Sequence, residues 1–387
     1  MDFVSVKDFP EGKTYVLLSK NYRKNLISHS MNQLNCKNYF ELSIWINKKL
    51  KTKFNGGDVK YWIAGERLDE RTKKIHPKFM PLSLVLELIG LNNEKIENLH
   101  SNIISYRSGG SGLVITAPIL PIKITPELDS IVIHLFGDGA AGDFTPSYTQ
   151  KNKAQVDNFV KKLENCFGKF EKSVYLTQGK YQLRFPKAIT DILSKYYSIE
   201  SYRSHDSDIP ARILNSADKK RKLACIVAFI VDEGNVRDVI SVYSVNKKLI
   251  NGIRELVTGC SYNCSKIQFN KKASSYLFTL GTQDIERFYR DVQGLSKEFS
   301  TCNLSFKEDE VKFIIERRTK KNPKNRKITE KLILDLLKDN NLSARQISKK
   351  ISYAYCTVIH TLEKLLEEKI VRRTKTNNKT YIWGCFE

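Results

Sequence analysis

The sequence lacks the features that would place it in a membrane or outside the cell. Its 387 residues contain no run of about 18 apolar residues, which excludes an ordinary membrane-spanning helix. The first residues, Met1–Gly12, have no apolar core of the kind that a secretory signal requires. A basic amphipathic anchor is also missing. We therefore expect a protein that stays in the cytoplasm.

Cysteine is present, but it lacks the spacing of a metal site. The 8 cysteines are scattered, and the nearest pair, Cys260 and Cys264, has no second pair and no neighbouring histidine. A structural zinc site needs four such ligands at short spacings. We expect reduced, mostly buried thiols and no zinc.

Acidic residues are few compared with basic ones. Lys and Arg number 65 against 42 Asp and Glu, which gives a net charge of +23 and a pI near 9.5. A basic surface gains free energy by releasing the counterions that are condensed on nucleic acid. An acidic membrane surface would attract the same charge, but no anchor is present. The charge therefore favours a polyanionic partner such as nucleic acid.

The first hundred residues show a helical pattern. Helices are expected over 38–50, 59–64 and 81–91, with a tight polar turn between the first two. This arrangement suits a helix-turn-helix with 58–66 as recognition helix; a plain helical bundle is the alternative. The glycine- and proline-containing stretch 101–124 then predicts a linker.

The central region repeats one order of elements at long range. An apolar helix, a strand, a helix, a hairpin and a further helix are expected over 128–136, 144–151, 153–167, 172–185 and 187–198. The same order follows over 223–231, 236–244, 247–258, 266–280 and 282–293, with Gly294 placed to end the last helix. A duplication this long predicts two similar lobes related by a pseudo-twofold axis.

The last sixty residues or so predict a second DNA-reading module. Helices over 329–338, 343–351 and 353–368 precede two strands at 371–375 and 381–383, which together suit a winged helix-turn-helix. Ser343 and Gln346 have the spacing of a capping box. The expected DNA contacts are Tyr353, Tyr355, Thr357 and His360 on the recognition helix and Arg372, Arg373 and Lys375 on the wing. A wing that mediates dimerisation is the alternative.

Each apolar helix of the duplication ends in an acid next to glycine. The sequences are Phe136-Gly137-Asp138-Gly139 and Val231-Asp232-Glu233-Gly234, and Glu233 follows Asp138 by 95 residues. An acid at a helix C-terminus costs about 0.3–1 kcal/mol against the helix dipole, and two such acids side by side repel each other. Divalent cations would remove both costs, and Mg²⁺ suits carboxylate oxygens. Such acids can serve phosphodiester hydrolysis, although Gly-Asp-Gly is also an ordinary helix end.

These two helices carry a family resemblance. The stretches IVIHLFGDG (131–139) and IVAFIVDEG (226–234) resemble the paired LAGLIDADG helices of homing endonucleases, and the segment 209–216 resembles their archaeal and intein-associated members. The resemblance covers roughly 125–318. One departure is the bulky Ile133 at a position where the family has a small residue, as Ala228 is in the second helix.

The resemblance implies an α+β fold with two αββαββα lobes and a monomeric arrangement of the two lobes. It implies that Asp138 and Glu233 are the catalytic acids, and that Asp138, Glu233, Gly137 and Asp232 form the metal site, with Mg²⁺ or another divalent cation and no organic cofactor. His134 is expected in the core or lobe interface and not as a base. The fold also implies antiparallel sheets that lie in the DNA major groove.

Strand alternation indicates which side chains face the DNA. Residues opposite the apolar face of each strand are polar, as a sheet that packs helices on one side and bases on the other requires. The expected contacts are Gln182, Arg184, Arg237, Ser241, Tyr243, Lys266, Gln268 and Asn270. An ordinary solvated sheet face is the alternative.

The sequence thus predicts an N-terminal helix-turn-helix-like module, a linker, two lobes, a basic linker and a winged helix-turn-helix, at 1–100, 101–124, 125–208, 209–318, 319–328 and 329–387. The predicted function is Mg²⁺-dependent cleavage of double-stranded DNA at a specific site by a homing-type endonuclease. A non-catalytic transcription regulator with the same fold is the main alternative, and RNA binding is a third.

Overall fold

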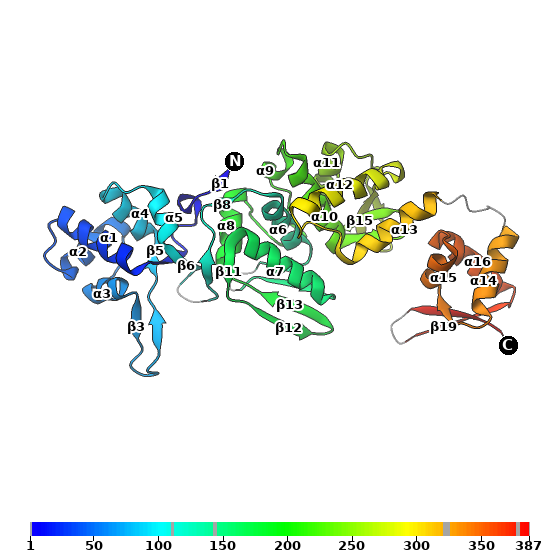
Figure 1. Ribbon diagram of the computed structural model, residues 1–387, viewed down its shortest axis with the longest axis horizontal. Coiled ribbons are helices and arrows are strands. Elements are labelled where there is room, and N and C mark those ends of the chain that lie inside the picture. Colours follow the sequence, from blue (N-terminus) through cyan, green and yellow to red (C-terminus); the bar gives the residue numbers. More distant parts are fainter. Residues whose placement is uncertain (1, 110–111, 142–144, 320–325, 377–379, 387) are drawn as a thin grey trace.

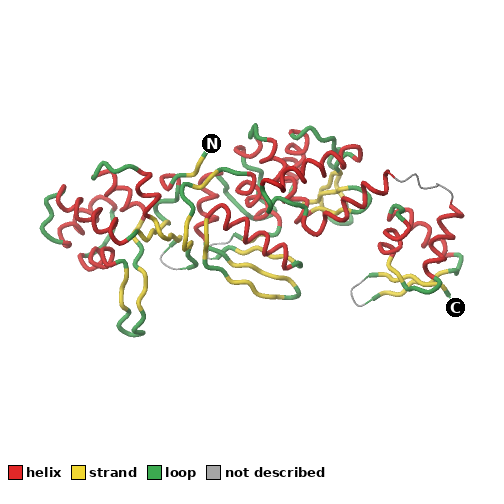
Figure 2. Tube along the Cα trace, viewed as in Figure 1, coloured by secondary structure: helices red, strands yellow, loops and turns green. Residues whose placement is uncertain are grey.

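The structure is a computed structural model that describes residues 2–109, 112–141, 145–319, 326–376 and 380–386. It combines helices with antiparallel sheets, and its parts lie in a row along the long axis, with the helices of the first hundred residues at one end and the C-terminal residues at the other (Figure 1; Figure 2). The N-terminus itself lies further inward, where Phe3–Val4 pair with Ile122–Lys123 (Figure 1). Within the described ranges, no helix is both long enough and apolar enough to cross a membrane.

The N-terminal module is built on a five-stranded sheet as well as on helices. The helices expected at 38–50, 59–64 and 81–91 are present as α2, α3 and α4 (Tyr39–Leu50, Gly56–Ala64 and Leu82–Leu91), beside α1 (Lys20–Gln33) and α5 (Ile96–Asn102). Between α3 and α4 an exposed hairpin of β3 (Glu66–Leu68) and β4 (Ile75–Pro77) stands away from the helices (Figure 1). The sequence pattern did not predict this hairpin.

The segment expected as a linker is largely structured. It forms β6 (Ile103–Ser108), β7 (Ile115–Pro118) and β8 (Ile122–Lys123). The sheet order is β11-β7-β6-β2-β5, with β2 at Thr14–Leu18, β5 at Met80–Pro81 and β11 at Gly168–Phe170. β11 comes from the first lobe, so this lobe and the N-terminal module share one sheet. The apolar residues of 115–124 are thus used for strand pairing and core packing.

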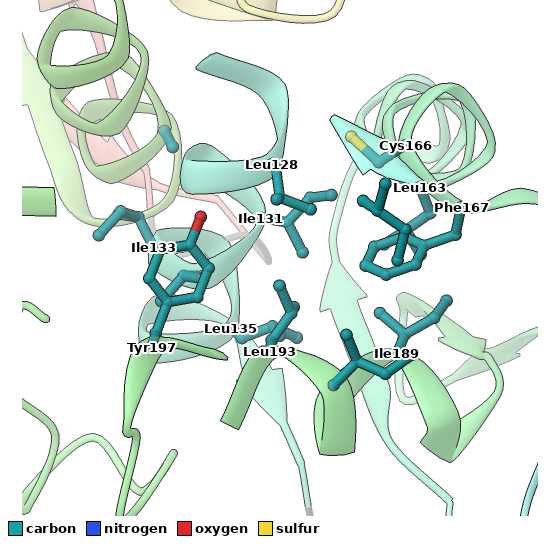
Figure 3. Close-up of a cluster of buried hydrophobic side chains, with 14 of the residues drawn as sticks. Leu128, Ile131, Ile133, Leu135, Leu163, Cys166, Phe167, Ile189, Leu193 and Tyr197 are labelled. Carbon is teal, nitrogen blue, oxygen red and sulfur yellow. The ribbon is translucent and has the colours of Figure 1, made fainter. Parts of the chain in front are cut away.

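Two buried helices cross at the centre of the molecule. α6 (Pro126–Gly137) begins where Thr125 accepts a hydrogen bond from the Leu128 N–H, with proline in its first turn. α10 (Lys219–Glu233) is buried over Leu223–Val231. Figure 3 shows side chains of α6 packed against those of α7 (Lys153–Phe167) and α8 (Lys187–Tyr197). An apolar surface on all sides marks a helix that belongs to the core.

An ion pair joins the two crossing helices near their N-termini. Arg221 Nε lies 2.6 Å from Asp129 Oδ2, and Arg221 Nη2 lies 3.1 Å from Asp129 Oδ1. The Tyr197 hydroxyl donates to the same carboxylate, which is fully buried. This bidentate ion pair is the favourable geometry for a buried guanidinium and carboxylate.

Each crossing helix is followed by a four-stranded antiparallel sheet. The first sheet has the order β9-β10-β13-β12, and the second has the order β14-β15-β17-β16. The strands are Gly139–Ala140, Ser147–Gln150, Lys180–Arg184 and Ser173–Thr177 in the first sheet, and Gly234–Val236, Ile240–Ser244, Ser275–Thr279 and Gln268–Asn270 in the second. The two sheets have the same order relative to the sequence, as expected for a duplication.

Two details of the second lobe differ from the expectation. The strand expected over 236–244 is a tight hairpin, with Asp238 in the turn between β14 and β15. Gly294 lies inside α12 (Ile285–Glu298) and does not end it. The buried stripe of this helix continues from Phe288 to Leu295, and tertiary packing therefore overrides the weak helix propensity of glycine.

The C-terminal module has its own apolar core. Its helices are α14 (Arg326–Leu337), α15 (Ala344–Ile351) and α16 (Tyr355–Glu367), and its sheet has the order β18-β20-β19, with strands Leu342–Ser343, Tyr381–Cys385 and Val371–Lys375. The capping box of Ser343 and Gln346 is confirmed. The remaining helices of the second lobe are α9 (Ala211–Leu214), α11 (Lys247–Gly259) and α13 (Glu308–Thr319), with a 3-10 turn at Ser305–Lys307.

Candidate functional site

Three carboxylates gather where the two crossing helices end. Asp138 follows the last residue of α6, and Asp232 and Glu233 are the last two residues of α10. The helices approach closely there, since a Cβ on Gly137 would lie 3.0 Å from the Asp232 Cβ. The small residue at the tightest contact on α6 is therefore Gly137, four residues after the bulky Ile133.

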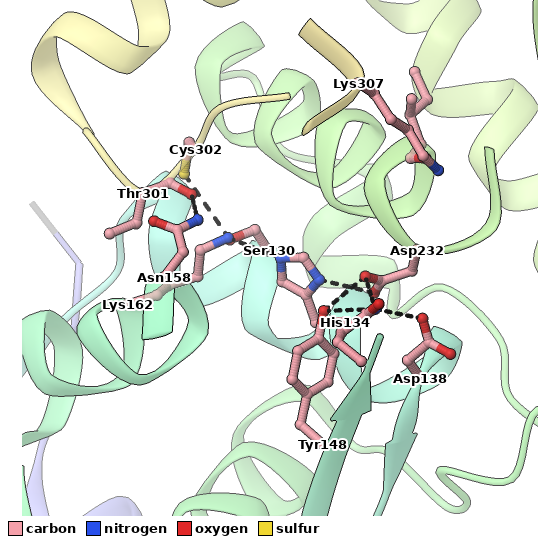
Figure 4. A network of polar contacts seen from close by, with 12 residues as sticks. Ser130, His134, Asp138, Tyr148, Asn158, Lys162, Asp232, Thr301, Cys302 and Lys307 are labelled. Carbon is pink, nitrogen blue, oxygen red and sulfur yellow. Dashed lines mark hydrogen bonds and ion pairs between the residues drawn. The ribbon is translucent and has the colours of Figure 1, made fainter. Parts of the chain in front are cut away.

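Asp232 is held by donors from the first lobe. Its side chain is 0% exposed. Oδ1 accepts hydrogen bonds from the Tyr148 hydroxyl at 2.7 Å and from Gln150 Nε2 at 3.0 Å, and Oδ2 lies 2.8 Å from His134 Nδ1 (Figure 4). Gln150 Nε2 also lies 2.5 Å from Asp138 Oδ2. One amide therefore connects the acids of the two helices.

His134 continues this network into the core. Lys162 Nζ lies 2.9 Å from His134 Nε2, and both side chains are buried. Burial, and then the charge of Lys162, hold the pKa of His134 well below its ordinary value. The imidazole is accordingly neutral, with Nε2 accepting from Lys162 and Nδ1–H donating to Asp232. A ring used on both sides suits a connecting role and leaves no nitrogen for proton transfer with substrate.

The acids are difficult to ionise together. Burial, followed by the charge of Asp232, raises the pKa of Asp138 to about 7. Burial also raises the pKa of Asp232 to about 7. Burial, then Asp138 and then Asp232 raise the pKa of Glu233 to about 7. The charge of Asp232 thus penalises ionisation of Asp138, and both charges penalise ionisation of Glu233, which is the electrostatic condition that favours a bound cation.

Lys307 supplies a positive charge beside these acids. Its Nζ donates to the backbone carbonyls of Ile230 at 2.5 Å and Gly234 at 2.6 Å, at the negative end of α10. Burial lowers the pKa of this lysine to about 8, while Asp232, Asp138 and Glu233 act in the opposite direction. The ammonium thus offsets part of the repulsion among the carboxylates.

The donor set fits a hard divalent cation that is shared with a substrate. Among the described residues, no group of three or more His, Cys, Asp or Glu is arranged to hold a metal ion by itself. Asp138 and Glu233 are half-buried, whereas the Asp232 carboxylate is occupied by protein donors. Mg²⁺ commonly uses only one or two carboxylates and takes the rest of its shell from water and phosphate oxygens. Two reachable carboxylates meet that need.

In the first sheet the two expected DNA-contact residues differ in accessibility. Arg184 is exposed, and its guanidinium carbon lies 5.2 Å from the centre of the Tyr175 ring. Gln182 is half-buried and donates to Ser147 Oγ at 2.9 Å. Arg184 is therefore available to a ligand, and Gln182 is partly used within the sheet.

The second sheet departs from the expected alternation. Ser241 is only 7% exposed, so its side chain lies in the protein. Phe269 lies between the expected contacts Gln268 and Asn270, so alternation would turn it inward, but it is 53% exposed and packs on Tyr276 at a ring distance of 5.0 Å. The edge strand is short, Gln268–Asn270, so pleat alternation is weakly enforced there.

The remaining expected residues of the second lobe are closer to the surface. Lys266, which precedes the strand, and Gln268 are exposed, and Tyr243 is half-buried. Asn270 accepts hydrogen bonds from the backbone N–H groups of the next turn, at Lys272 and Ala273. Asn270 therefore shapes that turn.

In the C-terminal module one expected contact is wrong. Tyr353 precedes α16, is 8% exposed and belongs to the module's core. Thr357 and His360 on α16 are exposed, and so are the wing residues Arg372, Arg373 and Lys375. The helix begins two residues later than expected because Tyr353 is used for packing.

The sequence pattern missed Tyr148, Gln150, Lys162 and Lys307. Tyr148 and Gln150 alternate along β10, which is a weak signal that both lie on one face. Lys162 lies in a helix with other lysines, and Lys307 lies 74 residues or more from each of the three acids. No spacing in the sequence distinguishes these two from the other basic residues.

Comparison with solved structures found limited likenesses. The chain is similar to mesophilic variants of the homing endonuclease I-DmoI, with 15% identity and a TM-score of 0.33 over 42% of this chain and 95% of that chain. It is similar to the homing endonuclease I-WcaI bound to its DNA recognition sequence, with 18% identity and a TM-score of 0.34 over 44% and 81%. It is also similar to full-length DUF199/WhiA from Thermatoga maritima, with 11% identity and a TM-score of 0.34 over 64% and 93%.

The structures of I-DmoI among these neighbours include complexes with DNA and Mn, Mg or Ca. No protein-family model matches the chain, and a search of curated proteins found no match.

Proposed function

We propose that this protein binds double-stranded DNA and hydrolyses its backbone with the help of a divalent cation. The observation that supports this most directly is the meeting of Asp138 and Glu233 at the ends of two crossing helices, with each pKa raised to about 7. A site that opposes its own ionisation gains most when a cation enters.

In this proposal Asp138 and Glu233 hold the ion, and the backbone at Gly137 lies beside it. Asp232 is a positioning residue, because Tyr148, Gln150 and His134 occupy its oxygens. When bound, Mg²⁺ supplies an activated water and stabilises the oxygen that leaves. The Gln150 amide holds the Asp138 carboxylate in place.

The charge of the chain supports nucleic acid as the partner. The net charge is +23, and Arg184, Lys266, Arg372 and Arg373 are exposed on the sheets and the wing. Contacts of this kind to phosphates position a protein on DNA, and base contacts add specificity. We include in the proposal that the two lobes arose by duplication and that the C-terminal module is a winged helix-turn-helix.

Cleavage of DNA by purified protein tests the proposal. With Mg²⁺, the wild type is expected to cut a specific duplex, and Asp138→Asn or Glu233→Gln is expected to abolish cutting while DNA binding persists. Glu286→Gln is a matched control, because Glu286 is exposed on α12 and its ion pair with Arg290, at 3.9 Å, is a surface contact. Cutting by either site variant at the wild-type rate would contradict the assignment.

A non-catalytic DNA-binding regulator is the second candidate. The observation that favours it is Lys307, since its ammonium already lies next to the acids where an added cation would otherwise be needed. Specific, salt-sensitive DNA binding without cleavage in Mg²⁺ or Mn²⁺ would select this function.

A further inference from the structure

The second lobe touches the C-terminal module through Asp238. This residue lies in the turn between β14 and β15. Its Oδ1 accepts from the Tyr355 backbone N–H at 2.8 Å, and its Oδ2 accepts from the Cys356 N–H at 3.1 Å. Arg317 Nη1 lies 2.5 Å from the same Oδ1. One carboxylate therefore binds the first two residues of α16 and an arginine of α13.

Helix α16 depends on this contact for its cap. The residue before the helix is Ala354, which has no side-chain acceptor for the exposed N–H groups. By contrast, Ser343 caps α15 from within the module. A helix start without its own cap is stabilised by an external anion, which the helix dipole also favours. Asp238 is that anion in this structure.

The surroundings of the contact are strongly basic. Arg237 lies over the Tyr355 ring at 5.2 Å, and Arg345 pairs with Glu310. A cavity of about 580 Å³ lies between the second lobe and the module. Its walls include Arg237, Arg345, Lys349, Arg373, Tyr355 and Trp383. Two acidic residues, Glu310 and Glu363, also line this cavity, so four basic side chains leave an excess of positive charge that suits the phosphate groups of DNA.

We propose that Asp238 is a reversible latch that holds the C-terminal module closed, and that a phosphate of bound DNA replaces its carboxylate at the start of α16. The proposal rests on the proposed DNA binding. A phosphate offers the same acceptor oxygens with more charge, and helix N-termini bind such groups readily. In the closed state Asp238 occupies the start of α16, so only the open molecules can bind DNA there. The apparent affinity for DNA is therefore reduced in proportion to the fraction of open molecules.

The test compares Asp238→Ala with Asp335→Ala in the full-length protein. Both changes remove one carboxylate, but Asp335 lies on α14 and pairs at 2.9 Å with Lys338, the residue that follows this helix. Small-angle X-ray scattering without DNA measures opening, and fluorescence anisotropy with a labelled duplex at fixed salt measures binding. Asp238→Ala is expected to increase the radius of gyration and to tighten binding about tenfold, while Asp335→Ala matches the wild type.

A second variant separates the latch from the change in charge. Ala354→Ser gives α16 its own cap without altering the charge, and it is expected to increase the radius of gyration in the same direction. Unchanged scattering for both Asp238→Ala and Ala354→Ser would overturn the latch, even if the protein binds DNA. If the variants increase the radius of gyration but the protein binds no DNA, the role of Asp238 in closing the molecule stands. The exchange with phosphate and the proposed function are then both overturned.

Discussion

The acid cluster predicts that removing a charge from the site stabilises the protein. Glu233 has its pKa raised from 4.5 to about 7 in the folded state. The folded protein therefore binds more protons than the unfolded chain between these values, and the free energy of unfolding falls as pH rises through that window. A shift of this size corresponds to about 3 kcal/mol. Partial exposure and relaxation of the neighbouring acids reduce it to about 1–2 kcal/mol.

Glu233→Gln is thus expected to be about 1–2 kcal/mol more stable than the wild type at pH 8 without divalent ions, and equally stable near pH 4. Urea unfolding followed by circular dichroism at both pH values measures this difference. Addition of Ca²⁺ at pH 8 is expected to raise the Tm of the wild type but not that of the variant, because a ligand stabilises only the state that binds it.

The exposed Glu286→Gln is the control, and it is expected to change stability little at either pH. The result that would refute the repulsion among the three carboxylates is a variant that is less stable than the wild type, with the same difference in the free energy of unfolding at pH 8 and at pH 4. The electrostatic argument for a cation would then fail with it.

Three further outcomes are expected. Arg221→Ala leaves the buried Asp129 carboxylate without its partner, and should lower the free energy of unfolding by about 3–5 kcal/mol in urea titrations. Gly137→Ala places a Cβ 3.0 Å from that of Asp232 and should destabilise the protein by about 1–3 kcal/mol, measured in the same way. Tyr148→Phe removes a donor at 2.7 Å from Asp232 and should cost about 1–3 kcal/mol at pH 8 and less near pH 4, where the carboxyl is protonated; equal costs at both would contradict the bond.

Local patterns predicted what depends on local sequence. The capped apolar helices, the hairpin around Gly179 and the paired glycine-flanked acids follow from periodicity, turn chemistry and repetition, and the structure has these elements where they were expected. The strands at 103–123 escaped prediction because their partners, at Thr14–Leu18 and Gly168–Phe170, are distant in sequence. An extended apolar segment does not indicate by itself what it pairs with.

The site shows the same division. Asp138 and Glu233 were predicted because each ends an apolar helix. Gln150 and Lys307 reach the acids only through the packing of β10 and of the turn before α13, and no pattern in the sequence encodes that approach. Tyr353 shows the reverse error, because an aromatic residue next to a helix start has the same sequence signature whether it faces solvent or the core.

The shared sheet β11-β7-β6-β2-β5 has a consequence for the proposed complex with DNA. Backbone hydrogen bonds join the N-terminal module and the first lobe in one sheet, which favours a constant spacing between the exposed hairpin β3–β4 and the acids. The C-terminal module contacts the second lobe through the Asp238 carboxylate, and release of the proposed latch would let that spacing change. In the proposed complex with DNA, the hairpin β3–β4 would therefore keep a fixed distance from the acids, whereas the distance from the acids to the C-terminal module could vary.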